Sequence, residues 1–157
     1  MPAKPSDTVV RAWARLIRAQ RLALGDAEDA LKSADLPPLA WYDALIELER
    51  AGNDGLRPFE LERAMLLEQY NLSRLLDRLE KAGYVERRAC EDDGRGQIVA
   101  IAAAGKAIRR RMWPVYAAAI EDALGRHLSA KQVETLDTLL GALIEKSRAP
   151  KNRTALR

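Results

Sequence analysis

The chain has little of the residues on which disulfide frameworks and metal sites depend. Its 157 residues include one cysteine, Cys90, and one histidine, His127. A single cysteine excludes an intrachain disulfide and fits a reducing compartment. A metal site needs several ligands at workable spacing, so we expect neither a metal nor another cofactor. We expect His127 to stabilise the end of a helix, and a redox role of Cys90 would need a partner chain or a small thiol.

Long apolar runs are missing as well. No stretch approaches the roughly 18 apolar residues that a membrane-spanning helix requires, and the first residues lack the apolar core of a secretory signal peptide. We therefore expect a cytoplasmic protein without a membrane partner. The sequence also lacks a phosphate-binding glycine loop, a nucleophile–base pair and paired carboxylates in apolar surroundings. These absences argue against an enzyme.

Positive charge is concentrated at the C-terminal end of the chain. The formal net charge is +3, yet the residues from 146 onward include basic side chains and no acid: Lys146, Arg148, Lys151, Arg153 and Arg157. The remainder is near neutral, so net charge alone does not indicate a nucleic-acid partner. We expect residues 1–8 to be a flexible N-terminus and residues 148–157 a basic disordered tail.

Two amphipathic segments flank the middle of the chain. Between Asp7 and Ser33 an apolar residue recurs every seven positions, at Val10, Ile17, Leu24 and Leu31. Ser129 and Gln132 have capping-box spacing and precede a helical stripe of Val133, Leu136, Leu140 and Leu143. Such stripes are typical of helices that pack on a partner. We predict a homodimer in which residues 9–36 and 104–147 are the dimerisation helices.

Residues 37–103 have the element order of a winged helix-turn-helix module. Helices are expected at 39–51, 58–65 and 68–82, with a very short strand at 56–57. Runs at 85–90 and 97–102 have strand propensity and flank a loop with two glycines, which predicts a hairpin; a helix at 104–127 comes next. The expected fold class is mainly α with a small β-hairpin: a winged helix-turn-helix DNA-binding module flanked by N- and C-terminal dimerisation helices.

The segment 68–82 presents a polar face suited to reading double-stranded DNA. Its leucines define one side of the helix and the polar residues lie opposite. The N-terminal part of a recognition helix normally reaches base edges, which nominates Tyr70, Asn71, Ser73 and Arg74. Phosphate contacts are expected from Arg78 and Lys81. Arg87 and Arg88 lie on opposite faces of the first expected strand and should add one phosphate contact between them. At the hairpin tip a glycine precedes and follows Arg95, and such an extended guanidinium suits a narrow minor groove.

Three stretches resemble the MarR family of transcriptional regulators. Residues 93–105 (DGRGQIVAIAAAG) are similar to the wing of that family. Residues 74–87 (RLLDRLEKAGYVER) resemble its recognition helix, and 56–61 (LRPFEL) the lead-in to the motif. The resemblance implies a dimeric, usually repressing regulator of a palindromic operator, often released by a small aromatic or phenolic ligand or by cysteine oxidation. Ala102 replaces the usual Thr, and Phe59 stands where a Ser or Thr cap is common.

A ligand cleft is one interpretation of the few aromatic residues. Aromatic walls with one or two arginines suit a flat anionic ligand, and the candidates are Trp13, Trp41, Tyr42 and Trp113 with Arg11, Arg15 and Arg18. Aromatics at helical spacing also occur as ordinary core, and an arginine row as a solvated face. Two other functions stay open: a winged-helix module that binds an acidic protein, and a nucleic-acid-binding architectural protein without sequence preference.

Overall fold

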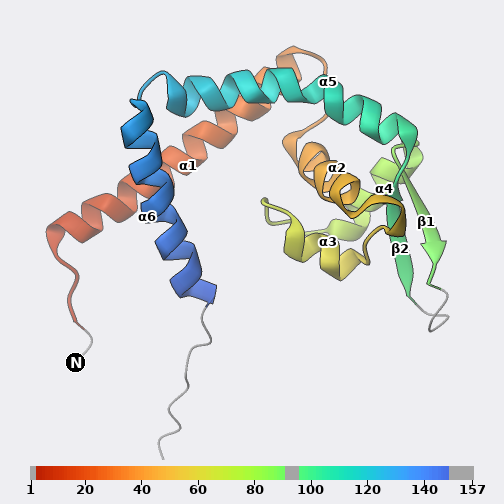
Figure 1. Cartoon of the computed structure of the whole chain (residues 1–157), viewed down its shortest axis with the longest axis horizontal. Coiled ribbons are helices and arrows are strands. Elements are labelled where there is room, and N and C mark those ends of the chain that lie inside the picture. Colours follow the sequence, from red (N-terminus) through yellow and green to blue (C-terminus); the bar gives the residue numbers. More distant parts are fainter. Residues whose placement is uncertain (1–2, 91–95, 149–157) are drawn as a thin grey trace, which may run out of the picture. The chain divides into compact units, whose positions relative to one another are not determined.

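The structure, a computed structural model, describes residues 3–90 and 96–148 (Figure 1). It divides into two units, the first ending at Ala119 and the second beginning at Ile120. The elements of the first unit are α1 (Asp7–Ser33), α2 (Leu39–Ala51), η1 (Gly52–Asp54), α3 (Pro58–Ala64), α4 (Leu72–Lys81), β1 (Val85–Ala89), β2 (Gln97–Ile101) and α5 (Ala103–Ile120). The π-helical turn η2 (Glu121–Gly125) and α6 (Ala130–Arg148) come after them. The expected order of helices and hairpin is confirmed, as is the winged-helix fold class.

Helix α1 begins at Asp7, so two residues of the expected flexible N-terminus are helical. The Ser6 hydroxyl accepts a hydrogen bond from the Val9 amide at 3.3 Å, and Asp7 places a negative charge at the positive end of the helix dipole. Ala27 and Leu31, near the other end, are buried in the core. From Val9 to Leu22 the side chains of α1 are exposed.

Helix α2 supplies the centre of the core. Leu39, Leu45 and Leu48 are almost completely buried, and α1, α3, η1 and β2 all pack against this helix. Pro38 precedes it and offers no side-chain cap. The carboxylate of Glu28 on α1 takes that role, because both of its oxygens lie 3.2 Å from the Leu39 amide nitrogen. One acid of α1 therefore fixes where α2 begins.

The expected short strand at 56–57 is an isolated bridge to the hairpin. Leu56 and Val99 exchange two backbone hydrogen bonds, of 2.9 and 2.8 Å. Gly55 precedes the bridge at a φ of +66°, and a β-carbon there would overlap the Val99 carbonyl oxygen. Helix α3 is capped at Arg57, whose amide donates to Glu60 Oε2 at 2.8 Å. Assigning the cap position to Phe59 was therefore wrong, and Phe59 is exposed.

Strands β1 and β2 form an antiparallel pair in which Val85 faces Ile101 and Ala89 faces Gln97. Each strand ends one residue earlier than expected. Ala102, which lacks the hydroxyl of the usual Thr, uses its backbone instead: its amide donates to the Tyr84 carbonyl at 2.9 Å, and its carbonyl accepts from the Lys106 amide at 3.1 Å. The second of these is the ordinary first backbone bond of α5, and an alanine offers no hydroxyl to the amides of the first turn.

The C-terminal helices differ from expectation in one place. We expected a helix at 104–127, but α5 ends at Ile120 and η2 comes after it. The Arg126 amide donates to the Glu121 carbonyl at 3.0 Å, five residues back, which widens this turn relative to an α-helix. The capping box of α6 is confirmed, since the Ser129 amide donates to Gln132 Oε1 at 2.8 Å and the Gln132 amide to Ser129 Oγ at 3.4 Å.

The first prediction concerns Gly105, in the first turn of α5. A β-carbon there would overlap the Tyr84 carbonyl oxygen and lie 2.9 Å from the Ile101 side chain. Gly105→Ala should destabilise the protein by about 1–3 kcal/mol, as overpacking does. Gly25→Ala is the control, because nothing lies within 4 Å of a β-carbon at that position of α1, and it should stabilise by up to about 1 kcal/mol. Urea unfolding measures both. Equal stability of the two variants would contradict the close packing of α5 on the hairpin.

Candidate nucleic-acid interface

The recognition helix begins later than the sequence indicated. We expected it to span 68–82, but α4 starts at Leu72 and ends at Lys81. Asn71 is its N-cap, and its Oδ1 accepts from the Arg74 amide at 2.9 Å. Tyr70 and Asn71 therefore precede the helix, and the Tyr70 side chain is fully exposed. With Oδ1 engaged in the cap, the amide nitrogen of Asn71 is the group best able to contact a base.

A residue of α2 binds the connection that precedes α4. Oδ1 of Asp43 accepts from the Leu66 amide at 2.9 Å, and Oδ2 accepts from the Leu67 amide at 2.6 Å. These amides belong to the connection between α3 and α4, which includes the polar residues at 68–70. The helix itself begins only after its N-cap, Asn71.

The body of α4 divides into a buried and an exposed side. Leu75, Leu76 and Leu79 are buried, and this confirms the orientation inferred from their spacing. The expected contact residues on the helix are all exposed: Ser73, Arg74, Arg78 and Lys81. The helix thus presents three cationic side chains with a hydroxyl at its N-terminal end.

Asp77 lies on the same helix, but an arginine of the hairpin neutralises its charge. Arg87 of β1 places Nη2 2.7 Å from Asp77 Oδ1 and Nε 3.7 Å from Glu80 Oε2. The Arg87 side chain is only 18% exposed. It therefore ties β1 to α4 and neutralises acids that would otherwise weaken the positive face.

Arg88 alternates with Arg87 along β1 and is exposed. Its Nη2 donates to the Asn53 carbonyl oxygen, which anchors the arginine beside η1. Of the two strand arginines, Arg88 is the better placed for a phosphate, because Arg87 would have to leave its carboxylates. Arg95 lies outside the described residues, so its minor-groove contact stays a prediction.

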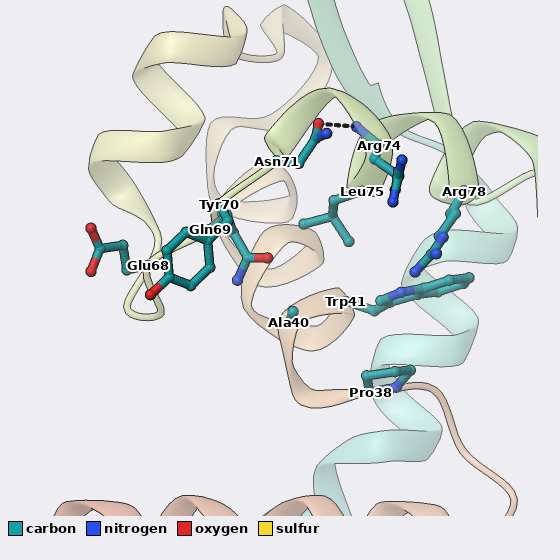
Figure 2. Close-up of a pocket in the computed structure, with 10 residues that line it drawn as sticks. All are labelled: Pro38, Ala40, Trp41, Glu68, Gln69, Tyr70, Asn71, Arg74, Leu75 and Arg78. Carbon is teal, nitrogen blue, oxygen red and sulfur yellow. Dashed lines mark hydrogen bonds between the residues drawn. The ribbon is translucent and has the colours of Figure 1, made fainter.

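A pocket of about 280 Å³ lies between the start of α2 and the N-terminal half of α4. Its lining residues are Pro38, Ala40, Trp41, Glu68, Gln69, Tyr70, Asn71, Arg74, Leu75 and Arg78. Figure 2 shows Arg78 reaching from α4 toward the ring of Trp41, with Arg74 on the same side of the helix. Tyr84 meets Trp41 edge-on, with ring centroids 5.8 Å apart, and holds the indole in place.

The other aromatic candidates for a ligand cleft lie elsewhere. Tyr42 stacks on Trp113 with centroids 6.0 Å apart, and both rings contact Tyr116 edge-on at 5.2 and 6.2 Å. Trp13 is 66% exposed on α1. Arg11, Arg15 and Arg18 are exposed on the same helix. The structure thus brings Trp41 together with Arg74 and Arg78, and Tyr42 with Trp113, but does not place the α1 arginines in the lining of the pocket.

Two ionisable groups near this aromatic cluster have shifted pKa values. Burial raises the pKa of the Tyr116 phenol above its usual range, and the nearby Asp43 and Tyr42 raise it further. Burial on its own would lower the pKa of Arg109, but hydrogen bonds with Glu49 and Tyr42 outweigh that effect and raise it. The Arg109–Glu49 ion pair links α5 to α2.

The sequence did not reveal the role of Asp43 or the pairing of Arg87 with Asp77 and Glu80. The signal for Asp43 was present, because it is an acid at a buried position of an apolar helix, between Tyr42 and Ala44. Nothing in the sequence identified which amides it would bind. In the part of the chain that the structure describes, no group of three or more metal-ligating side chains is found. Nor is any described helix both long enough and apolar enough to cross a membrane.

A short helix, a turn, an exposed second helix and a hairpin tied to it define a winged helix-turn-helix protein. The sequence profile of the MarR family matches residues 34–96. The multiple antibiotic resistance protein MarR of Escherichia coli K12 is 33% identical over 85 residues, which is 54% of this chain and 59% of that protein. The chain is thus similar to the MarR family over its winged module, and it covers less than two thirds of that relative's length.

Solved structures of MarR family regulators share the fold over nearly the whole chain. Sco3205 of Streptomyces coelicolor, a MarR family transcriptional regulator solved in complex with DNA, superposes with a TM-score of 0.85 at 25% identity, covering 96% of this chain and 94% of that one. AbsC of the same organism superposes with a TM-score of 0.80 at 26% identity, covering 93% and 98%.

Proposed function

We propose that the chain is a sequence-specific double-stranded DNA-binding transcriptional regulator, a repressor that acts as a homodimer on a palindromic operator and not as an enzyme. The observation that carries this proposal is the exposed face of α4, where Ser73, Arg74, Arg78 and Lys81 lie opposite three buried leucines. An α-helix fits the major groove, where every base pair has its own pattern of donors and acceptors. The DNA complex of Sco3205 supports the same assignment.

The position of each residue along α4 suggests its role. Ser73 and Arg74 lie in the first turn, beside Tyr70 and Asn71, where a recognition helix meets base edges. Arg78 and Lys81 lie one and two turns later and suit phosphates, and Arg88 adds a phosphate contact from β1. The acids that could repel phosphate on this face, Asp77 and Glu80, are paired with Arg87.

The second prediction separates base reading from phosphate binding. Arg74→Ala should cost roughly 1–3 kcal/mol on the selected site and relax preference at one position in each half-site. Lys81→Ala should instead weaken binding about equally on all duplexes and lower the salt slope by about one unit. Arg95→Ala should lose most on sites with an A·T-rich flank. Lys131→Ala, on α6, is the control that should change nothing.

The measurement is selection of bound duplexes from a random pool, followed by competition titrations of each variant at several salt concentrations. Unchanged affinity of both Arg74→Ala and Arg95→Ala would contradict the assigned interface and favour a protein-binding winged helix. Salt-sensitive binding without any selected sequence would favour an architectural nucleic-acid-binding protein.

Homodimerisation is proposed from apolar surface that the single chain leaves exposed. On α1 the exposed side chains include Val9, Val10, Trp13, Leu16, Ile17 and Leu22; on α6 they include Leu139, Leu143 and Ile144. Large apolar side chains that recur along an exposed helix usually mark an interface. A two-fold dimer through α1, α5 and α6 would cover them and carry two winged modules.

The third prediction tests the dimer through α6. Leu136→Asp with Leu140→Asp should dissociate it, because two charges would be buried in an apolar interface. Thr138→Asp with Ala142→Asp is the matched control, since these exposed residues have the same spacing on the opposite side of the helix. Sedimentation velocity measures the mass of each variant. A wild-type chain that sediments as a stable monomer would overturn the proposal.

A small aromatic acid is the ligand that the pocket supports best. Its volume of about 280 Å³ suits a single substituted ring. Trp41 offers a flat apolar surface, and Arg74 and Arg78 offer positive charge (Figure 2). Because these arginines also belong to the proposed DNA face, ligand and DNA should weaken each other's binding by the same factor.

The fourth prediction concerns tryptophan fluorescence. A phenolic acid such as 4-hydroxybenzoate should quench the wild-type chain, and Trp41→Phe should remove that quenching because Trp41 lines the pocket. Trp113→Phe is the control, since Trp113 packs in the separate cluster with Tyr42, and it should leave the quenching intact. If Trp113→Phe alone removes the quenching, the ligand binds at the aromatic cluster instead.

A further inference from the structure

Asp43 occupies an unusual position for a charged side chain. Among the residues that the structure describes it is the one charged residue that is buried, with 6% of its surface exposed. Burying a carboxylate is costly unless hydrogen bonds compensate it. Asp43 lies on α2, outside the helix-turn-helix pair, and no general requirement of the core calls for an acid there.

The hydrogen bonds of Asp43 are directed at one short segment. Each carboxylate oxygen accepts one backbone amide, from Leu66 at 2.9 Å and from Leu67 at 2.6 Å. Both amides belong to the connection between α3 and α4. A bond from a backbone amide to an ionised carboxylate is shorter and stronger than a neutral one. Two adjacent amides bound by one carboxylate leave this connection little freedom to shift.

The same connection leads directly into the proposed DNA face. Leu67 is packed partly against the core, whereas Leu66 and Tyr70 on either side of it are exposed. Asn71 then caps α4 through the Arg74 amide. The position of Tyr70, Asn71 and Arg74 therefore depends on where the Leu66–Leu67 segment is held.

We propose that Asp43 is a positioning residue for sequence reading: its carboxylate clamps the turn of the helix-turn-helix motif and so sets the N-terminal end of α4 against the bases. This inference rests on the proposed function. Base contacts require placement within a fraction of an ångström, whereas phosphate contacts by long flexible side chains tolerate displacement. Loss of the clamp should therefore reduce sequence preference more than overall affinity for DNA.

The test uses the isosteric variant Asp43→Asn in the full chain. Its side chain keeps one acceptor oxygen but turns an amide donor toward the second backbone amide. Hydrogen exchange on the protein without DNA should show faster exchange at Leu66 and Leu67 than in the wild type. The ratio of affinities for selected and scrambled duplexes should fall at least about fivefold, the discrimination that one base-reading side chain provides, while affinity for the scrambled duplex stays within about twofold.

Ile108→Val is the matched control, because it perturbs a buried residue of α5 without touching the turn, and it should keep both the exchange pattern and the ratio. If Asp43→Asn does not fold, Asp43→Ser, with one small acceptor, replaces it and should give the same result. A folded Asp43 variant that keeps the wild-type ratio would overturn the positioning role alone. A wild-type chain with no preference for any duplex would overturn the proposed function, and the positioning role with it.

Discussion

The burial of α2 organises the winged module, because α1, α3, η1 and β2 pack directly against this helix. Leu39, Leu45 and Leu48 have almost no exposed surface, and the helices and strand around them are amphipathic segments that have one apolar side to cover. Removing apolar surface from water is the main favourable term in folding. Two acids then bind backbone amides at the edges of this buried helix and hold the neighbouring segments in place. Glu28 fixes the start of α2, and Asp43 fixes the connection between α3 and α4.

Much of the fold could be predicted from local patterns. The Pro and Gly residues around α2 predicted the bounds of that helix, because those signals act within a few residues of the boundary. The heptad spacing predicted that α1 is a long helix, but not that it begins at Asp7. The start of α4 could not be found this way. Glu68, Gln69 and Tyr70 look helical in isolation, but Asp43 lies more than twenty positions earlier and holds the preceding amides. The helix begins at its Asn71 cap, and the residues before it lie in a connection that a distant acid holds.

In the candidate site too, local spacing predicted some features, whereas contacts between separate elements could not be predicted. The spacing of Leu72, Leu75, Leu76 and Leu79 was enough to predict that Arg74, Arg78 and Lys81 are exposed, since helix geometry fixes which residues share a face. Strand alternation predicted that Arg87 and Arg88 point to opposite sides. It could not reveal that Arg87 binds Asp77 and Glu80, nor that Trp41 of α2 shares a pocket with Arg74 and Arg78. Those pairings depend on how separate elements pack.

The pairing of Arg87 with two carboxylates of α4 has a mechanical consequence. Because Arg87 of β1 binds two carboxylates of α4, the strand and the helix are held at a defined distance from each other. The separation between the surfaces that α4 and the hairpin contact is then fixed by these ion pairs. In the proposed complex, a duplex whose groove dimensions match this separation would bind without distortion, and one with a wider or narrower groove would have to bend. DNA stiffness can thereby contribute to selectivity at positions that no side chain contacts.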